Sequence, residues 1–85
     1  MYELRKTRRF QKYLRKLEKK DQNRILEKLS LLVAGRWEQL DLRKLKGATD
    51  CFRLRSGIYR VLFEKRTDEL IIILVAVRHR KESYR

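Results

Sequence analysis

The segments Phe52-Arg-Leu-Arg-Ser-Gly57 and Tyr59-Arg-Val-Leu-Phe-Glu64 decide the fold of this chain. In the first segment apolar residues alternate with arginines, and in the second Tyr59, Val61 and Phe63 alternate with Arg60, Leu62 and Glu64. This is the pattern of a β-strand that buries one face. Ser56-Gly57 predicts a tight turn between the two strands. A second turn at Thr67-Asp68 leads into Leu70–Val77, whose apolar character on both faces indicates a central strand. These spacings predict an antiparallel meander of three strands.

The residues before this meander have the periodicity of two amphipathic helices. The first helix follows an expected N-cap at Thr7, and the second begins at an expected N-cap at Asp21 and ends near Gly35. The apolar stripes, spaced three and four residues apart, are Phe10, Tyr13, Leu14 and Leu17 in the first helix and Ile25, Leu26, Leu29, Leu32 and Val33 in the second. Because few residues separate them, the two helices are expected to form an antiparallel hairpin.

Together these elements predict one α+β domain over residues 1–85. Tyr2–Arg5 is expected to add a short first strand, and Trp37 to Gly47 a connecting segment whose leucines contact the core. The helical hairpin should pack on one face of the sheet, which is the only large apolar surface on offer. The expected order is β-α-α-β-β-β, with about four antiparallel strands.

The charge of the chain points to a polyanionic partner. Lys and Arg total 24 against 11 Asp and Glu, which gives a formal net charge of +13. A soluble protein with this charge usually meets nucleic acid, an acidic protein or an anionic membrane. The single cysteine, Cys51, excludes an internal disulfide and fits a reducing compartment. With no secretory signal and an apolar run too short to cross a bilayer, the chain is expected to be cytoplasmic and not bound to a membrane.

Strand alternation places three arginines on the face of the sheet away from the helices. Arg53, Arg55 and Arg60 share this face if the apolar residues beside them point to the core. Like charges on adjacent strands repel, so such a cluster indicates a bound anion, and arginine suits bidentate contact with phosphate. Farther along, Arg78, His79, Arg80 and Lys81 follow the central strand at the sheet's edge, with Tyr84 a few residues later. No metal-ligand cluster or Gly-rich phosphate loop occurs, so no metal or other cofactor is expected.

Residues 43–84 resemble the RelE/ParE superfamily of bacterial and archaeal toxins. The resemblance is carried by Lys44-Leu-Lys-Gly47, by Phe52–Arg60 with the following Val-Leu-Phe-Glu64, and by His79-Arg-Lys-x-x-Tyr84. It implies the RelE-like microbial-ribonuclease-type fold and a cognate antitoxin partner. Two functions diverge within the superfamily: RelE-like members cleave messenger RNA in the ribosomal A site, whereas ParE-like members act on DNA gyrase.

The RelE branch of the family implies a catalytic set, which here corresponds to Arg53, Arg55, Arg60, Arg80 and Tyr84. This chain departs from the family pattern in having arginine for lysine on the second strand and shorter spacing at Ser56-Gly57 and before Tyr84. Arg78 or Lys81 can stand in for Arg80. The set predicts a metal-independent endoribonuclease in which a 2′-hydroxyl attacks its own phosphate. Arg60 and Arg80 would clamp the extra negative charge, and Tyr84 would orient the hydroxyl or take its proton.

Other basic side chains are expected to bind RNA without taking part in the reaction. They are Arg8, Arg9, Lys12, Arg15, Lys16, Lys19 and Lys20 on the helices, Lys44 and Lys46 before the strands, and Arg78, His79 and Lys81 after them. Such phosphate contacts set affinity and carry no sequence information. The expected partners are ribosomal RNA, messenger RNA and an antitoxin. Two alternatives stay open, a ParE-like gyrase inhibitor and a non-catalytic RNA-binding relative.

Overall fold

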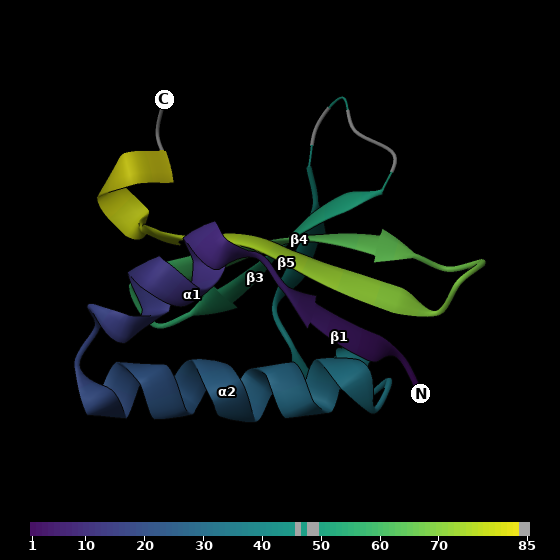
Figure 1. The fold of residues 1–85 in the computed structure, drawn as a ribbon, viewed down its shortest axis with the longest axis horizontal. Coiled ribbons are helices and arrows are strands. Elements are labelled where there is room, and N and C mark those ends of the chain that lie inside the picture. Colours follow the sequence, from purple (N-terminus) through teal and green to yellow (C-terminus); the bar gives the residue numbers. More distant parts are fainter. Residues whose placement is uncertain (46, 48–49, 84–85) are drawn as a thin grey trace.

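Two helices cover one face of a twisted β-sheet (Figure 1). The computed structural model describes residues 1–45, 47 and 50–83. Within these residues the strands are β1 (Glu3–Lys6), β2 (Leu42–Lys44), β3 (Cys51–Ser56), β4 (Tyr59–Arg66) and β5 (Ile71–His79). The helices are α1 (Arg8–Arg15) and α2 (Lys19–Val33), and the 3₁₀ turns are η1 (Trp37–Gln39) and η2 (Arg80–Ser83).

The sheet has the strand order β1-β5-β4-β3-β2. The α+β class and the packing of the helical hairpin on one sheet face are confirmed, but the described residues form five strands where about four were expected. The additional strand, β2, lies in the segment that was expected to be a connection, and its Leu42 pairs with Leu54. In addition, β1 pairs parallel with β5, so the sheet is mixed. Strand direction depends on how distant elements pack, which local alternation does not encode.

Helix α1 begins where the sequence predicted. The Thr7 hydroxyl oxygen accepts the N–H of Phe10 at 3.2 Å, which confirms Thr7 as the N-cap. The same hydroxyl lies 2.8 Å from the carbonyl oxygen of Leu74 and 3.0 Å from that of Val75, to which it donates. Thr7 therefore starts the helix and also attaches it to β5.

Helix α2 begins earlier than expected and ends as expected. Its N-cap is Glu18, so the prediction of Asp21 was wrong; Asp21 lies in the first helical turn, where its carboxylate is close to the positive end of the helix dipole. At the other end Gly35 has φ +80° and donates its N–H to Leu32, while Arg36 donates to Leu31. This pair of bonds is a Schellman motif, and it requires the left-handed conformation that glycine adopts without strain.

The hydrophobic core lies between the helices and the sheet. Its buried members are Phe10, Leu14, Ile25, Leu29, Leu32, Leu54, Val61, Phe63, Ile72, Leu74 and Val77. Leu62 and Phe63 on β4 pair with Ala76 and Leu74 on β5, so Val75 is an extra residue in a β-bulge. The bulge lets Leu74 and Val77 join the same core, although three positions separate them.

Candidate nucleic-acid interface

Three arginines form a row across the three central strands of the sheet, close to the end at which β4 begins. Arg55, Arg60 and Arg78 lie directly opposite one another on β3, β4 and β5. The residues that precede or follow them, Leu54, Val61 and Val77, belong to the core under the helices. Because successive side chains of a strand alternate between faces, the row lies on the other, open face of the sheet.

Two more arginines extend the row along the open face. Arg53 precedes Arg55 by two residues on β3, and Arg43 on β2 is its cross-strand partner. We call these five residues the open-face arginines: Arg43, Arg53, Arg55, Arg60 and Arg78. Sequence reasoning missed Arg43 because a strand of three residues gives too little alternation to be recognised. The short pattern Leu42-Arg-Lys-Leu45 was the available signal.

Lys44 lies on the opposite side from these arginines. It pairs with Phe52 and lines a small apolar cavity of about 110 Å³ on the helix side, together with Trp37 and Lys65. The ammonium group of Lys65 lies 3.8 Å from the centre of the Trp37 ring. Lys44 is therefore separated from the open-face arginines, because a shift of one residue along a strand reverses the face, and its predicted contact with RNA stays a prediction.

The positive charges of the open face are partly buried and lie close to one another. The Arg53 side chain is only 16% exposed, and its nearest carboxylate among the described residues, Asp41, is 4.0 Å away. Burial lowers the pKa of Arg53 and neighbouring Arg60 lowers it further, whereas Asp41 acts in the opposite direction. Among the described atoms, the buried Nε groups of Arg53 and Arg78 have no hydrogen-bond partner. An anion on this face would supply acceptors to buried donors and reduce the mutual repulsion.

The residues after β5 do not all join this surface. Tyr59 pairs with His79 one position beyond the Arg60–Arg78 pair, so His79 lies on the helix side, where its ring meets Tyr59 edge-on with centroids 5.6 Å apart. Arg80 is exposed and begins η2, beyond the end of the row, and exposed Lys81 follows it. The sequence placed Arg78 and His79 at one edge, but the structure separates them onto opposite faces.

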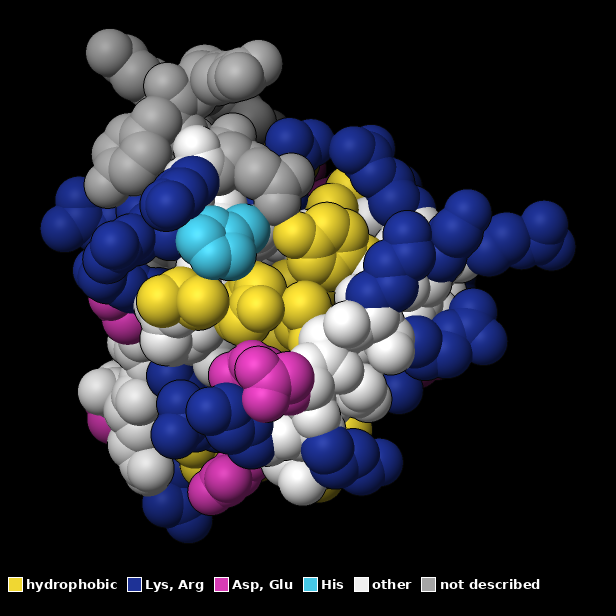
Figure 2. All heavy atoms as spheres, turned by 90° about the vertical axis from the view of Figure 1, so that its left-hand side faces the viewer, with side chains coloured by type: hydrophobic (Ala, Val, Ile, Leu, Met, Phe, Trp, Pro, Cys, Tyr) yellow, Lys and Arg dark blue, Asp and Glu magenta, His cyan; other side chains and the backbone are white. Residues whose placement is uncertain are grey.

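The end of the molecule that carries η2 has a mixed surface. Figure 2 shows the single histidine at the edge of a hydrophobic area, with lysine and arginine side chains on both sides of the two. Burial raises the pKa of Tyr59, and the carboxylates of Asp21 and Glu18 at the start of α2 act in the same direction. Tyr59 therefore packs against the core on the helix side, and His79 contacts it there, away from the open-face arginines.

The basic residues of the helical layer that were predicted to bind RNA are exposed: Arg8, Arg9, Lys12, Arg15, Lys16, Lys19 and Lys20. They belong to the layer that covers the other face of the sheet, so they form a surface separate from the open-face arginines. Lys46, predicted to bind RNA, and Tyr84, predicted to be catalytic, lie outside the described part of the chain, and their roles stay predictions.

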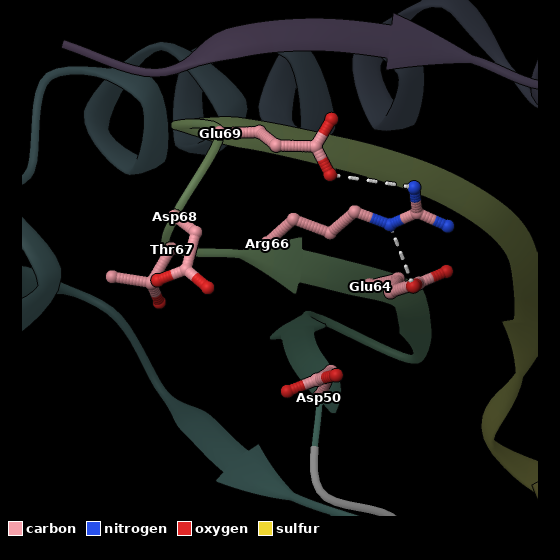
Figure 3. Close-up of a pocket in the computed structure, with 6 residues that line it drawn as sticks. All are labelled: Asp50, Glu64, Arg66, Thr67, Asp68 and Glu69. Atoms are coloured by element: carbon pink, nitrogen blue, oxygen red, sulfur yellow. Dashed lines mark hydrogen bonds and ion pairs between the residues drawn. The ribbon is translucent and has the colours of Figure 1, made fainter.

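A larger hollow lies at the opposite end of β4, and its charge is unsuited to RNA (Figure 3). It has a volume of about 470 Å³ and is lined by Asp50, Glu64, Arg66, Thr67, Asp68 and Glu69. Arg66 pairs with Glu64 at 3.0 Å and with Glu69 at 3.6 Å. Since its acidic side chains outnumber its single cation, this hollow repels phosphate groups, and we exclude it as the nucleic-acid site.

Other kinds of site find no support in the described residues. Within 1–45, 47 and 50–83, no three His, Cys, Asp or Glu side chains come together as a metal site would require. In the same part of the chain, no helix combines the length and the apolar character needed to span a membrane.

Residues 4–84 match the family model described as the ParE toxin of the type II toxin–antitoxin system parDE. The chain belongs to this toxin family. The resemblance to the RelE/ParE superfamily is thereby confirmed, and the chain is a toxin of a toxin–antitoxin system with a RelE-like fold. No curated protein sequence matches this ParE-family chain.

Solved structures show the same fold. A chain of the archaeal RelE–RelB complex from Pyrococcus horikoshii OT3 is 27% identical, with 96% of this chain and 98% of that chain aligned at a TM-score of 0.81. For the intact Escherichia coli RelBE toxin–antitoxin complex the identity is 28%, the coverages are 93% and 96%, and the TM-score is 0.74. The Methanococcus jannaschii RelB–RelE complex gives 27% identity, coverages of 94% and 94%, and a TM-score of 0.72.

Proposed function

We propose that this toxin is a ribosome-dependent endoribonuclease that cleaves messenger RNA in the A site and so inhibits translation. The observation that carries the proposal is the row of Arg55, Arg60 and Arg78 across three strands of the open face. In the reaction a ribose 2′-hydroxyl loses its proton as its oxygen bonds to the adjacent phosphorus. The bond from that phosphorus to the 5′-oxygen breaks as that oxygen takes up a proton, which leaves a 2′,3′-cyclic phosphate and a 5′-hydroxyl. The transition state carries extra negative charge on the phosphoryl oxygens, which fixed cations stabilise.

The row suits this charge because arginine stays protonated at every pH at which the protein works. Arg60 is in the middle, so a phosphate above it is within reach of guanidinium groups on both neighbouring strands. Strands are about 4.8 Å apart, so the three side chains cover a width of about 10 Å. Arg53 and Arg43 continue the positive surface towards β2 and offer contacts to flanking phosphates. We assign Arg80, which follows Arg78 by two residues at the start of η2, as a further clamp.

Proton transfer is assigned to Tyr84, which would orient the 2′-hydroxyl or accept its proton. A phenol among cations loses its proton more readily than one in water. A tyrosine is a weak base for this step. Cleavage would therefore depend on the ribosome, which would hold the message in a reactive geometry. The basic helical surface, with Arg8, Lys12 and Lys16 among its members, is assigned to docking on ribosomal RNA.

A cognate antitoxin is part of the same proposal. The relatives from Pyrococcus horikoshii, Escherichia coli and Methanococcus jannaschii were solved as complexes of RelE with RelB. A chain with a net charge of +13 is suited to a partner with an acidic segment. Because its substrate would be messenger RNA on translating ribosomes, the toxin is proposed to act in the cytoplasm.

Inhibition of DNA gyrase is the second candidate, and the match to the ParE family model favours it. A gyrase inhibitor would use the arginines for contact with a protein and would cut no RNA. A third candidate, an RNA-binding relative without activity, would bind ribosomes and leave the message intact.

The test uses purified toxin and a defined message on ribosomes with an empty A site, with cleavage mapped by primer extension. We expect cuts at the A-site codon only when ribosomes are present. Arg60→Ala should lower the rate about 10²- to 10³-fold, as removal of a charge-stabilising donor does in other enzymes. Arg66→Ala is the matched control, because Arg66 is also on β4 but pairs with Glu64 and Glu69 at the far end. Its rate should stay within about threefold of wild type, since exposed ion pairs contribute little.

Intact message with and without ribosomes would overturn the nuclease proposal. Inhibition of gyrase supercoiling by the same preparation would then support the second candidate. Ribosome binding without cleavage or gyrase inhibition would support the third. Equal rates for Arg60→Ala and wild type would remove the arginine row from the reaction.

A further inference from the structure

Two hydrogen bonds hold the turn that follows β5. The N–H of Arg80 donates to the carbonyl oxygen of Ile58 at 2.6 Å, which ties the turn to the β3–β4 hairpin. The N–H of Lys81 donates to Nδ1 of His79 at 3.1 Å. The side chain of His79 is therefore one of two groups that bond to the backbone of this turn.

The contact has the geometry of a helix N-cap. An N-cap side chain accepts the N–H of the second or third residue of the helix, and Lys81 is the second residue of η2. A ring nitrogen can accept a hydrogen bond only when it carries no hydrogen, so in the neutral imidazole the hydrogen must be on Nε2. The edge-on contact with Tyr59, at an interplanar angle of 84°, adds a second constraint on the ring.

We infer that His79 is a positioning residue, which caps η2 and thereby holds Arg80 in place two residues after Arg78, the row member on β5. The inference rests on the proposed function, because it assigns Arg80 a task in RNA cleavage. His79 lies on the helix side and the row lies on the open face, so His79 acts through the turn and not by contact with the scissile phosphate. This role differs from the RNA contact that the sequence predicted for it.

The test compares His79→Ala, which removes the acceptor, with His79→Asn, which supplies a side-chain oxygen common at N-caps. Exchange of the Lys81 amide hydrogen, followed by NMR at pH 8, should become about fivefold faster in the alanine variant, as loss of a cap worth ~1 kcal/mol implies. Cleavage on ribosomes should fall about tenfold, since a displaced clamp loses transition-state contacts. In His79→Asn, the exchange rate of the Lys81 amide and the cleavage rate should both return to within about threefold of wild type. Gln39→Ala, at an exposed position on η1, is the control and should change neither.

Several results would overturn the inference. One is a Lys81 amide that exchanges equally fast in wild type and in His79→Ala. Another is a His79→Asn protein in which the amide is protected but cleavage stays as low as in His79→Ala, because the ring itself would then be needed. Nitrogen NMR showing the ring hydrogen on Nδ1 would also contradict the cap. If wild type cleaves no message, the proposed function fails alone, and the exchange rates still decide whether His79 caps the turn.

Discussion

Arg55 and Arg60 lie directly opposite each other on the antiparallel strands β3 and β4. Two like charges in this position repel, and on an ordinary sheet selection for stability would separate them. Here Arg78 continues the same row on β5, and Arg53 has a lowered pKa because it is buried beside these cations. The sheet thus keeps its proposed anion site at a cost to its own stability.

The first prediction concerns this cost. Arg55→Thr should raise the free energy of unfolding by about 0.2–1 kcal/mol at low salt, because it removes a cross-strand repulsion and introduces a residue that favours strands. The gain should shrink at about 0.5 M salt, where exposed charges are screened. Urea unfolding of wild type and Arg55→Thr at low salt and at about 0.5 M salt measures the change in the free energy of unfolding.

The matched control is Arg66→Thr, which removes the same charge from an arginine that is paired with Glu64 and Glu69. It should leave stability unchanged or lower it by up to about 1 kcal/mol. A loss of stability in Arg55→Thr equal to that of the control would show that the row carries no net repulsion.

A second prediction separates the two neighbours Arg43 and Lys44, which lie on opposite faces of β2. Arg43→Ala should weaken binding to an RNA oligonucleotide and reduce the slope of log affinity against log salt by about 1, as loss of one phosphate contact does. Lys44→Ala should change that slope much less, since Lys44 lines the cavity beside Trp37. Titrations by fluorescence anisotropy over a salt series compare the two, and equal slopes would contradict the assignment of the open face.

Thr7 gives a third prediction, this time on stability. Thr7→Ala should lower the free energy of unfolding by about 1–2 kcal/mol, because the hydroxyl caps α1 and also bonds to the carbonyl groups of β5. Thr7→Ser keeps the hydroxyl and should recover most of the loss. Thermal and urea unfolding measure both variants; a serine variant as unstable as the alanine variant would mean that the methyl group, not the hydroxyl, is what matters.

The fourth prediction is a pH dependence at Tyr59. Its pKa is raised in the folded state, by burial and by Asp21 and Glu18, above the value of about 10 for an unfolded chain. The associated stability is fully present below about pH 10 and is lost as the pH rises through the folded-state pKa, because only the unfolded chain then ionises freely. Wild type should therefore lose more stability than Tyr59→Phe between pH 8 and pH 11. If the free energies of unfolding of the two proteins differ by the same amount from pH 8 to pH 11, Tyr59 does not contribute this pH dependence.

Much of the fold could be predicted because its signals are local. Alternation over Phe52–Leu54 and Tyr59–Phe63 found the hairpin and the face of Arg53, Arg55 and Arg60, and side-chain chemistry found the caps at Thr7 and Gly35. The N-cap of α2 was misplaced because Glu18, which makes no side-chain capping bond, has no sequence signature of its own. Strand β2 was missed because three residues are too few to show a period.

The sequence alone determined the α+β class, the helical hairpin, the arginine-rich strands and the resemblance to the RelE/ParE toxins. These follow from short-range periodicity, turn chemistry and motif order, which do not require contacts between distant residues. Tertiary structure alone decided that β1 runs parallel to β5, that Arg43 and Arg78 join the open face, and that His79 is turned away from them. Those features depend on the pairing register of distant strands, where a shift of one residue reverses every side chain.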